Sequence, residues 1–377
     1  MSPSSLQTLH FDLITEIICR LPVKSLMKFK CVCKPWNALI SADRKFARKH
    51  LRCMSSTMNH SLIQQSENNP SDFSIYPLRT FFTSCTTIDA TEITFPLHGE
   101  NYFDDRISIV AFCDGIFCLT VGPYRESIAV LWNPSIRKYN ILPPLEENQR
   151  FRDTYVHTVY GYTVYGFGYD NIRDNYKVVA VTFYNCNSSG IFKTQTQVKV
   201  HTFGTTSWRL IDEFPSGSFG EFSVRPGKFV SGTINWLVFK HNSTLCSIVS
   251  LDLGTESYQE ILQPDYGEET VERIRTLGVL RDCLSLISGQ DIWLMKEYGN
   301  RNSWTKFATV PQGSSFNREI LYTTEDDEVL LEIIMHLSRS KLMVYDSTND
   351  TLKSLDIKTN GNGRLSIYVE SLISPCS

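Results

Sequence analysis

A strand-and-turn pattern that returns about every 50 residues is the feature that most limits how this chain of 377 residues can fold. Five segments share one layout, in which an alternating apolar strand is followed by a polar turn and a second strand. These segments are 131–142, 200–211, 250–261, 292–307 and 344–355. Another strand pair with a tight turn precedes each of them, at 113–121, 167–183, 229–239, 276–288 and 319–334. The chain therefore repeats a unit of four strands.

A four-stranded unit with this period is typical of a β-propeller, in which each unit is one blade. The strands of 60–100, taken together with 364–373, supply one more unit that joins the two ends of the chain. Such closure would leave no exposed sheet edge for other chains to pair with. We therefore predict an all-β domain built as a six-bladed β-propeller; five or seven blades and a twisted β-sandwich are the alternatives. Most of five tryptophans at strand positions should pack in the core or between blades rather than form a binding platform: Trp132, Trp208, Trp236, Trp293 and Trp304.

The first fifty or so residues have a different, helical pattern. Apolar residues at 13, 14, 17, 18 and 21 line one side of a helix, and Pro22 ends it because proline has no amide hydrogen. Apolar positions resume from Leu26 to Ile40 at spacings of three and four, and Pro35 fits the first turn of a third helix. We expect a small all-α block of three short helices. A block of this size buries too little surface by itself and needs a partner for its apolar side.

Charge separates this block from the rest of the chain. Residues 1–52 contain ten Lys or Arg and three Asp or Glu, whereas the whole chain has a net charge of −3. A basic helical block on an acidic body favours an anionic partner. Because basic and apolar residues are interleaved in the block, an acidic protein with a hydrophobic groove is the first candidate and nucleic acid is the second.

The helical block resembles the F-box, the motif that docks into a Skp-family adaptor. The matching sequences are RLPVKSL at 20–26 and KFKCVCKPWNALI at 28–40. One departure is His10, which stands where the family usually has proline; we expect the loss of that rigid apolar contact to weaken docking by about 1 kcal/mol. By the resemblance, nine residues are candidates for adaptor binding: Leu9, Leu13, Ile14, Ile17, Leu21, Pro22, Leu26, Val32 and Trp36. Some of them are expected to serve the core of the block instead.

The strand repeat carries a second resemblance. CDGIFCL at 113–119, LWNPSIRKYNILP at 131–143 and SLDLGTESYQEI at 250–261 are similar to the F-box-associated domain of plant F-box proteins, often called kelch-type. The two resemblances divide the chain into three parts. We expect an F-box helical domain at 6–52, a polar linker or first hairpin at 53–72, and an F-box-associated, propeller-like domain at 73–377.

Motifs of several enzyme classes and metal sites are missing from the sequence. No GxSxG, HExxH or P-loop sequence occurs. None of the 11 cysteines forms a CxxC pair, and Cys31, Cys33, Cys113 and Cys118 lack matching ligand pairs downstream. We expect no catalytic residue, metal or cofactor, and we expect these four thiols to be buried, the last two on one strand. Because no membrane-spanning apolar run and no secretory signal pattern occur, we expect a protein of the cytoplasm or nucleus, without a membrane partner.

These observations predict the substrate-recognition subunit of an SCF (Skp–cullin–F-box) ubiquitin ligase, which is a non-catalytic adaptor. By the resemblance, the F-box binds a Skp-family adaptor and through it cullin and RING subunits, while the propeller presents an unidentified target protein. The loops at 143–160, 185–196 and 267–275 are candidates for target contact. A protein-interaction scaffold without a role in ubiquitination and a nucleic-acid binder using the basic helices are the alternatives. An enzyme would need acidic or histidine side chains that converge on the central channel.

Overall fold

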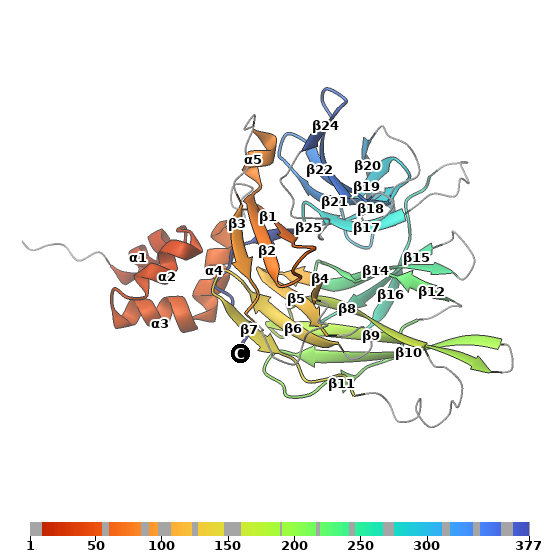
Figure 1. The fold of residues 1–377 in the computed structure, drawn as a ribbon, viewed down its shortest axis with the longest axis horizontal. Coiled ribbons are helices and arrows are strands. Elements are labelled where there is room, and N and C mark those ends of the chain that lie inside the picture. The colour runs from red at the N-terminus through yellow and green to blue at the C-terminus, as the bar shows by residue number, and fades with distance from the viewer. Residues whose placement is uncertain are drawn as a thin grey trace, which may run out of the picture.

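The computed structural model describes residues 10–54, 60–83, 90–96, 107–122, 127–146, 160–188, 191–215, 219–240, 246–266, 275–310, 317–334, 340–355 and 365–376. A helical module lies against one side of a ring of β-sheets (Figure 1). The module contains α1 (Phe11–Ile18), α2 (Val23–Phe29), α3 (Lys34–Ala42) and α4 (Arg44–Met54). The sequence predicts three short helices here, and the structure adds α4 as a fourth. None of the helices in the described ranges is both long and apolar enough to span a membrane.

The break between α3 and α4 is a single residue, Asp43. Its backbone is extended, with φ −83° and ψ 104°, and its Oδ1 accepts a hydrogen bond from the Phe46 amide at 2.9 Å. An aspartate side chain that accepts an amide of the first turn is a strong helix start. Because neither proline nor glycine marks this break, the hydrophobic spacing alone does not reveal that a new helix begins there.

Six sheets follow in the described part of the chain, and they are the blades of a six-bladed β-propeller. The first blade contains β25 (Leu365–Val369), β1 (His60–Gln65), β2 (Asp72–Pro77) and β3 (Thr91–Thr94), with the short helix α5 (Arg79–Phe82) after β2. The second blade contains β4 (Ile107–Cys113), β5 (Ile116–Val121), β6 (Ile128–Asn133) and β7 (Lys138–Ile141). The third contains β8 (Tyr160–Asp170), β9 (Asn175–Ser188), β10 (Ile191–Thr202) and β11 (Arg209–Leu210).

The remaining three blades follow in chain order. The fourth contains β12 (Phe219–Val224), β13 (Lys228–Val230), β14 (Thr233–Lys240), β15 (Cys246–Asp252) and β16 (Tyr258–Ile261). The fifth contains β17 (Arg275–Leu280), β18 (Cys283–Ser288), β19 (Asp291–Met295) and β20 (Trp304–Thr309), with a short 3₁₀ helix, η2 (Arg301–Ser303), before β20. The sixth contains β21 (Asn317–Thr323), β22 (Glu328–Ile334), β23 (Ser340–Asp346) and β24 (Thr351–Leu355).

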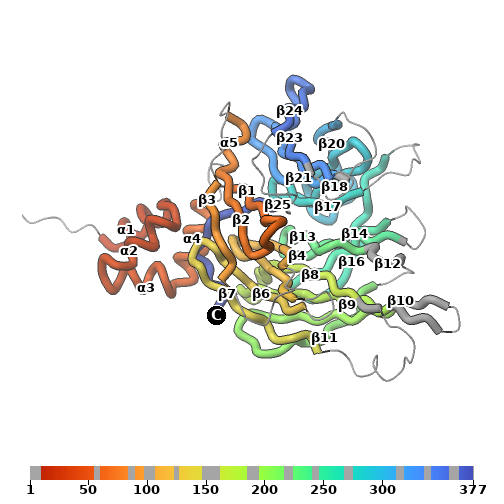
Figure 2. Tube along the Cα trace, viewed as in Figure 1, coloured from red at the N-terminus to blue at the C-terminus, as the bar shows by residue number. Residues whose placement is uncertain are grey.

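The two ends of the β-domain close the ring. β25 pairs with β1 in antiparallel register, from His60 opposite Val369 to Gln64 opposite Leu365. Figure 2 shows β25, near the blue end of the chain, beside the orange β1. β1 also pairs with β2, so a hairpin with its turn at residues 66–71 is present in the first blade. The prediction of six blades closed by the chain ends is therefore confirmed, and the β-sandwich alternative is wrong.

The hairpin turns of several blades use the same local chemistry. Asp170, Asp252 and Asp346 each begin a turn, and each Oδ1 accepts hydrogen bonds from the backbone amides two and three positions later. The residue four positions later has a positive φ, for example 50° at Asp174 and 58° at Glu256. Aspartate and asparagine favour such turns because the side chain bonds its own backbone and tolerates the left-handed region. This chemistry explains why polar turns recur with the blades.

Buried aromatic residues pack between neighbouring blades. Trp132 contacts Phe73 and Phe95 of the first blade, with 5.2 Å between ring centroids in each pair. Trp236 is buried in a cluster shared by the third and fourth blades. Trp304 is buried too, whereas Trp208 and Trp293 are half-buried, so the prediction holds for three of the five tryptophans. Tryptophan rings of this kind bury a large apolar area where two sheets meet.

The cysteine predictions need two corrections. Cys113 ends β4 and Cys118 lies within β5, so these two buried thiols occupy two strands rather than one. The turn at Asp114 and Gly115, where both residues have positive φ, separates the strands. Cys31 and Cys33 are exposed, not buried, because they lie in the turn between α2 and α3. Within the described ranges, no group of three or more His, Cys, Asp or Glu residues could hold a metal ion.

Candidate adaptor-docking surface

Several predicted docking residues lie on the surface of the helical module. Leu13, Ile17 and Val32 are 53%, 57% and 62% exposed, which is unusual for large apolar side chains. Pro22 is exposed as well. Phe11, at the first position of α1, is 43% exposed and was not among the predicted residues, because the predicted series began at Leu13. We call Leu13, Ile17 and Val32 the docking surface.

α1 has apolar residues on two adjacent sides. Ile18 is buried, and Ile14 packs against the same core cluster. Leu13 and Ile17 are one turn apart, share a side of the helix and are more than half exposed. The protein therefore covers one part of the apolar arc of α1 and leaves the other part open. An arc of this kind is what a helix needs if it docks onto another protein.

The remaining predicted docking residues contribute to the module itself. Leu26 is fully buried (0% exposed) in the core cluster, so it is one of the residues that serve the core of the module rather than its surface. Ile14, Leu21 and Trp36 are half-buried and pack against that cluster. Leu9 lies outside the described residues.

His10 occupies the position before α1. Its backbone oxygen accepts hydrogen bonds from the amides of Leu13 and Ile14 at 3.0 and 3.2 Å. Its side chain is exposed and makes no capping hydrogen bond, although Nδ1 lies 3.1 Å from Oδ2 of Asp12. The φ of His10 is −59°, which lies within the narrow range of proline. The backbone at this position would therefore accept the proline that His10 replaces.

One side of α4 attaches the module to the propeller. The guanidinium carbon of Arg48 lies 3.6 Å from the centroid of the Tyr169 ring, a close cation–π contact. One turn earlier, Nη2 of Arg44 donates to the backbone oxygen of Asp174 at 3.5 Å. Both arginines thus meet the end of β8 and the turn that leads to β9. Figure 1 shows α4 as the helix of the module next to the sheets.

Another side of α4 binds the end of α1. Lys49 forms an ion pair with Glu16. Nε2 of the buried His50 lies 2.9 Å from the backbone oxygen of Leu21 and must donate to it, since a carbonyl only accepts. Burial lowers the pKa of His50, which keeps the imidazole neutral in this position. α4 therefore links the helix that carries Ile17 to the propeller.

The C-terminal residues form a second connection between the module and the propeller. Glu370 lies against the start of α2, where burial raises the pKa of its carboxyl group and the nearby Val23 amide opposes the shift. On the propeller side, Nδ2 of Asn133 donates to the backbone oxygens of Ser371 at 3.0 Å and Ile373 at 2.8 Å. Ile373 is buried in the cluster that contains the core residues of α1 and α2. Module and propeller thus share one apolar core.

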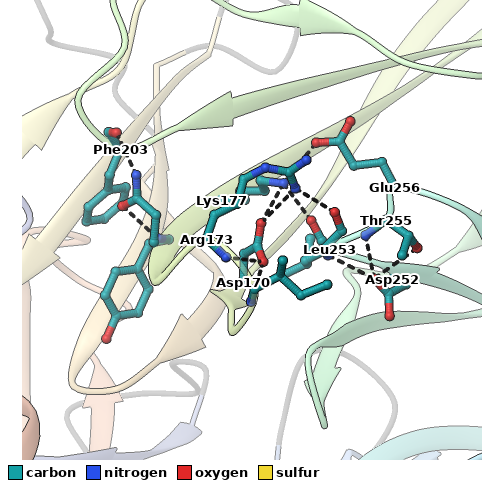
Figure 3. Close-up of polar contacts among 12 residues, drawn as sticks. Asp170, Arg173, Lys177, Phe203, Asp252, Leu253, Thr255 and Glu256 are labelled. Atoms are coloured by element: carbon teal, nitrogen blue, oxygen red, sulfur yellow. Dashed lines mark hydrogen bonds and ion pairs between the residues drawn. The ribbon is translucent and has the colours of Figure 1, made fainter.

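A buried ion network stabilises the turn that receives α4 (Figure 3). Nζ of Lys177 lies 2.9 Å from Oδ2 of Asp170 and 2.9 Å from Oε1 of Glu256. Asp170 and Lys177 flank the β8–β9 turn, and Glu256 lies in the β15–β16 turn, so the network joins the third blade to the fourth. Burial raises the pKa of Asp170, but hydrogen bonds from Lys177 and Arg173 outweigh this effect and keep the pKa below its ordinary value.

The helical module contacts one face of the propeller. Adjacent strands of a blade are antiparallel, so the first and third turns of each blade open on one face, whereas its second turn and the link to the next blade open on the other. The module meets a turn of the first kind at Asp174, and the C-terminal segment that packs on the module meets another at Asn133. The prediction of a long loop at 185–196 is wrong, because residues 185–188 belong to β9 and residues 191–196 to β10, which pair as a hairpin whose turn opens on the other face. The predicted target loops at 143–160 and 267–275 link neighbouring blades on that face, although residues 147–159 and 267–274 lie outside the described residues.

Comparisons with known proteins agree with this architecture. The model of the F-box associated beta propeller domain matches residues 69–375, and that of the F-box domain matches residues 6–48. An F-box/kelch-repeat protein of Arabidopsis thaliana is 31% identical, with 97% of this chain and 96% of the relative covered. The F-box protein CPR1 of the same plant is 27% identical, with coverage of 98% and 89%. Among solved structures, a chain of a nidogen/laminin complex aligns at 10% identity with a TM-score of 0.47, over 83% of this chain and 99% of that chain.

The two family models follow each other along the chain in the order of the two structural parts. The F-box model falls on the helical module, and the propeller model begins within the first blade and ends after β25. The chain therefore belongs to the family of F-box proteins that carry an F-box associated β-propeller domain.

Proposed function

We propose that this chain is the substrate-recognition subunit of an SCF ubiquitin ligase. In this role the F-box docks to a Skp-family adaptor, which leads to cullin and RING subunits, and the propeller binds a target protein. Members of the F-box family are generally adaptors rather than enzymes. The observation that carries the proposal is the exposure of Leu13, Ile17 and Val32 on a module whose other side is already buried.

On this proposal the chain contributes proximity and no catalytic residue. Binding adaptor and target at once makes ubiquitin transfer effectively intramolecular, so the gain depends on how well the distance between the two sites is defined. The contacts of α4 and of residues 370–373 with the propeller support a fixed distance. We propose that the target binds on the face away from the module, and that the protein acts in the cytoplasm or nucleus.

A charge placed on the docking surface tests the adaptor contact. The full-length Ile17→Asp variant should lose co-purification with a Skp-family adaptor, because a carboxylate cannot enter an apolar groove without a large desolvation cost. Leu210→Asp is the matched control, since Leu210 is also 57% exposed but lies on β11 in the third blade. The control should bind the adaptor as the wild type does. Wild-type binding by Ile17→Asp would show that this surface is not the docking site.

The same variant tests the ligase part of the proposal. Ile17→Asp should retain bound target proteins in affinity purification, because the propeller is unchanged while the ligase is no longer recruited. Targets captured in this way should be ubiquitinated in a reconstituted reaction with wild-type chain, adaptor, cullin and RING subunits, and not with the variant. Targets that bind both forms but receive no ubiquitin from the wild-type complex would point instead to a scaffold.

A further inference from the structure

Two thiols of the helical module face each other across α1 and α4. Sγ of Cys19, directly after α1, lies 3.5 Å from Sγ of Cys53 near the end of α4. Neither cysteine is in a disulfide. Cys19 is fully buried, whereas Cys53 is exposed. One sulfur of the pair is therefore open to solvent, and its neighbour is protected.

Neighbouring contacts keep these thiols opposite each other. Lys49, one turn before Cys53 on α4, is paired with Glu16, which precedes Cys19 by three residues. His50 bonds the backbone oxygen of Leu21 on the other side of Cys19. The two helix ends are thus aligned by polar contacts on both sides of the thiol pair. Bond formation requires the sulfurs to approach from 3.5 Å to about 2.05 Å.

We propose that Cys19 and Cys53 form a reversible disulfide when the protein meets a hydroperoxide, so that α1 becomes covalently joined to α4. The exposed sulfur of Cys53 attacks the peroxide oxygen, which breaks the O–O bond and gives a sulfenic acid and one water when hydrogen peroxide is the oxidant. The sulfur of Cys19 then attacks the sulfur of Cys53 and displaces the hydroxyl as a second water. The two thiols together lose two protons and two electrons, and these reduce the peroxide to two waters.

The burial pattern assigns the order of these steps. Burial raises the pKa of Cys19, and the neighbouring Cys53 raises it further, so Cys19 is the poorer nucleophile toward a peroxide in solvent. Its buried sulfur suits the second step, the attack on the sulfenic acid of Cys53. That step requires the two sulfurs to be close to each other and does not require Cys19 to be exposed to solvent. Cys31 and Cys33 are exposed as well, but they lie in the turn between α2 and α3 and not at this contact.

The bridge would close residues 19–53 into a loop that contains α2, α3 and Val32 of the docking surface. Cys19 lies roughly 120–160° around the axis of α1 from Leu13 and Ile17, at 3.6 residues per turn. The bridge therefore leaves the open side of α1 accessible while it restrains the unfolded chain. This inference does not depend on the proposed function, because it concerns the thiols and not the adaptor.

Peptide mapping of the full-length protein tests the bridge directly. After brief exposure to hydrogen peroxide and alkylation of the remaining thiols, trypsin should release residues 1–20 and 53–79 as one linked pair, with a mass lower by two hydrogens than the sum of the reduced peptides. Dithiothreitol should separate the pair. The matched control is the Cys31→Ser/Cys33→Ser variant, which should give the same linked pair. Linkage of either peptide to Cys31 or Cys33, or oxidation of Cys53 to sulfonic acid without linkage, would overturn the proposal.

A stability measurement separates bridge formation from unfolding. Cys53→Ser changes an exposed side chain and should keep the circular dichroism spectrum of the wild type. Peroxide should raise the thermal midpoint of the wild type and of Cys31→Ser/Cys33→Ser, and it should leave that of Cys53→Ser unchanged. An equal peroxide effect in Cys53→Ser would also contradict the bridge.

Discussion

Side chains of the helical module that have the same helical spacing in the sequence differ in how much of their surface is exposed. Leu13 and Leu26 both fall on apolar stripes of short helices, yet Leu13 is 53% exposed and Leu26 is fully buried. A period of 3.6 residues identifies the apolar stripe of a helix and does not tell which part of it the same protein covers. Here the covering residues include Leu372 and Ile373, from the far end of the chain. The sequence therefore predicted which residues are candidates for docking. Only the fold shows which of these candidates are exposed and which are buried in the core of the module.

Alanine substitutions at these two leucines should affect different properties. Leu26→Ala should destabilise the protein by about 2–5 kcal/mol, because it removes buried methyl groups and leaves a cavity. Leu13→Ala should change stability by less than about 0.5 kcal/mol, as is usual for surface positions, but should weaken adaptor binding. Chemical denaturation and calorimetric titration with a Skp-family adaptor measure the two effects. A large loss of stability in Leu13→Ala would place this side chain in the core and contradict the structure.

Substitution of His10 by proline would restore the residue that the family usually has at this position. The φ of −59° lets proline fit without strain, so His10→Pro should reduce the freedom of the unfolded chain and stabilise α1 by about 0.4–1 kcal/mol. If α1 must be ordered for docking, adaptor affinity should rise about two- to five-fold. Titration of wild type and variant with the same adaptor measures this ratio. Asp12→Asn is the control for loss of the His10–Asp12 contact, and it should not tighten binding.

At the scale of elements, the sequence predicted the repeated blades well and the contacts between elements poorly. The blades could be recognised because strand alternation and Asx turns are local and recur along the chain. The contact of Arg48 with Tyr169 joins residues far apart in sequence and leaves no local pattern. α4 was missed as a separate helix for a local reason, since the only mark of its start is the capping residue Asp43.

The carboxyl group of Glu370, which lies against the start of α2, should make the stability of the protein depend on pH. Burial raises the pKa of this carboxyl group above 4.5, although the Val23 amide and Lys24 oppose the shift. The folded protein therefore binds the proton more tightly than the unfolded chain does. The resulting stabilisation is fully present below the unfolded pKa and is lost as the pH rises through the folded pKa. Burial also raises the pKa of Asp114 at the same face, which adds to this trend.

Glu370→Gln should remove the contribution of Glu370 to this trend, because the amide stays neutral at every pH. The variant should be more stable than the wild type at neutral pH, and this advantage should disappear as the pH falls below the ordinary range of a glutamate. Thermal midpoints of both proteins across pH measure the difference. Glu260→Gln is the matched control, since Glu260 is exposed on β16, and it should show no such crossover. A pH-independent difference for Glu370→Gln would contradict the assignment.

For the whole molecule, ring closure and attachment of the module use neighbouring parts of the same C-terminal segment. β25 completes the first blade by pairing with β1, and it ends at Val369. The next residues leave the blade and lie against the module: Glu370 faces the start of α2 at Val23, and Ile373 is buried beside the helices. The sequence predicted the closure because strand pairing of the ends completes the repeat. The attachment of the helical module to the propeller was not predictable, since residues 370–373 contain no repeat or motif that indicates which residues they contact.

Removal of residues 370–377 should therefore separate the two roles of this segment. The truncated protein should keep a closed propeller, because the β25–β1 register lies entirely before the cut. Its helices should lose hydrogen-exchange protection, most strongly at the start of α2, because Glu370 no longer lies beside Val23 and the shared core loses Leu372 and Ile373. If the module then moves relative to the propeller, the distance between adaptor and target is no longer fixed, and ubiquitination should fall more than adaptor affinity does.

A shorter truncation shows whether this effect belongs to residues 370–373 or to chain shortening in general. Removal of residues 375–377 leaves the Glu370–Val23 contact, the bonds of Asn133 to residues 371 and 373, and the buried Ile373 in place. That variant should exchange and ubiquitinate like the wild type. Equal protection of α2 in all three proteins would mean that α4 alone holds the module on the propeller, through Arg44, Arg48 and the buried Phe46. The attachment would then be a property of one helix, and the C-terminal segment would serve only to close the ring.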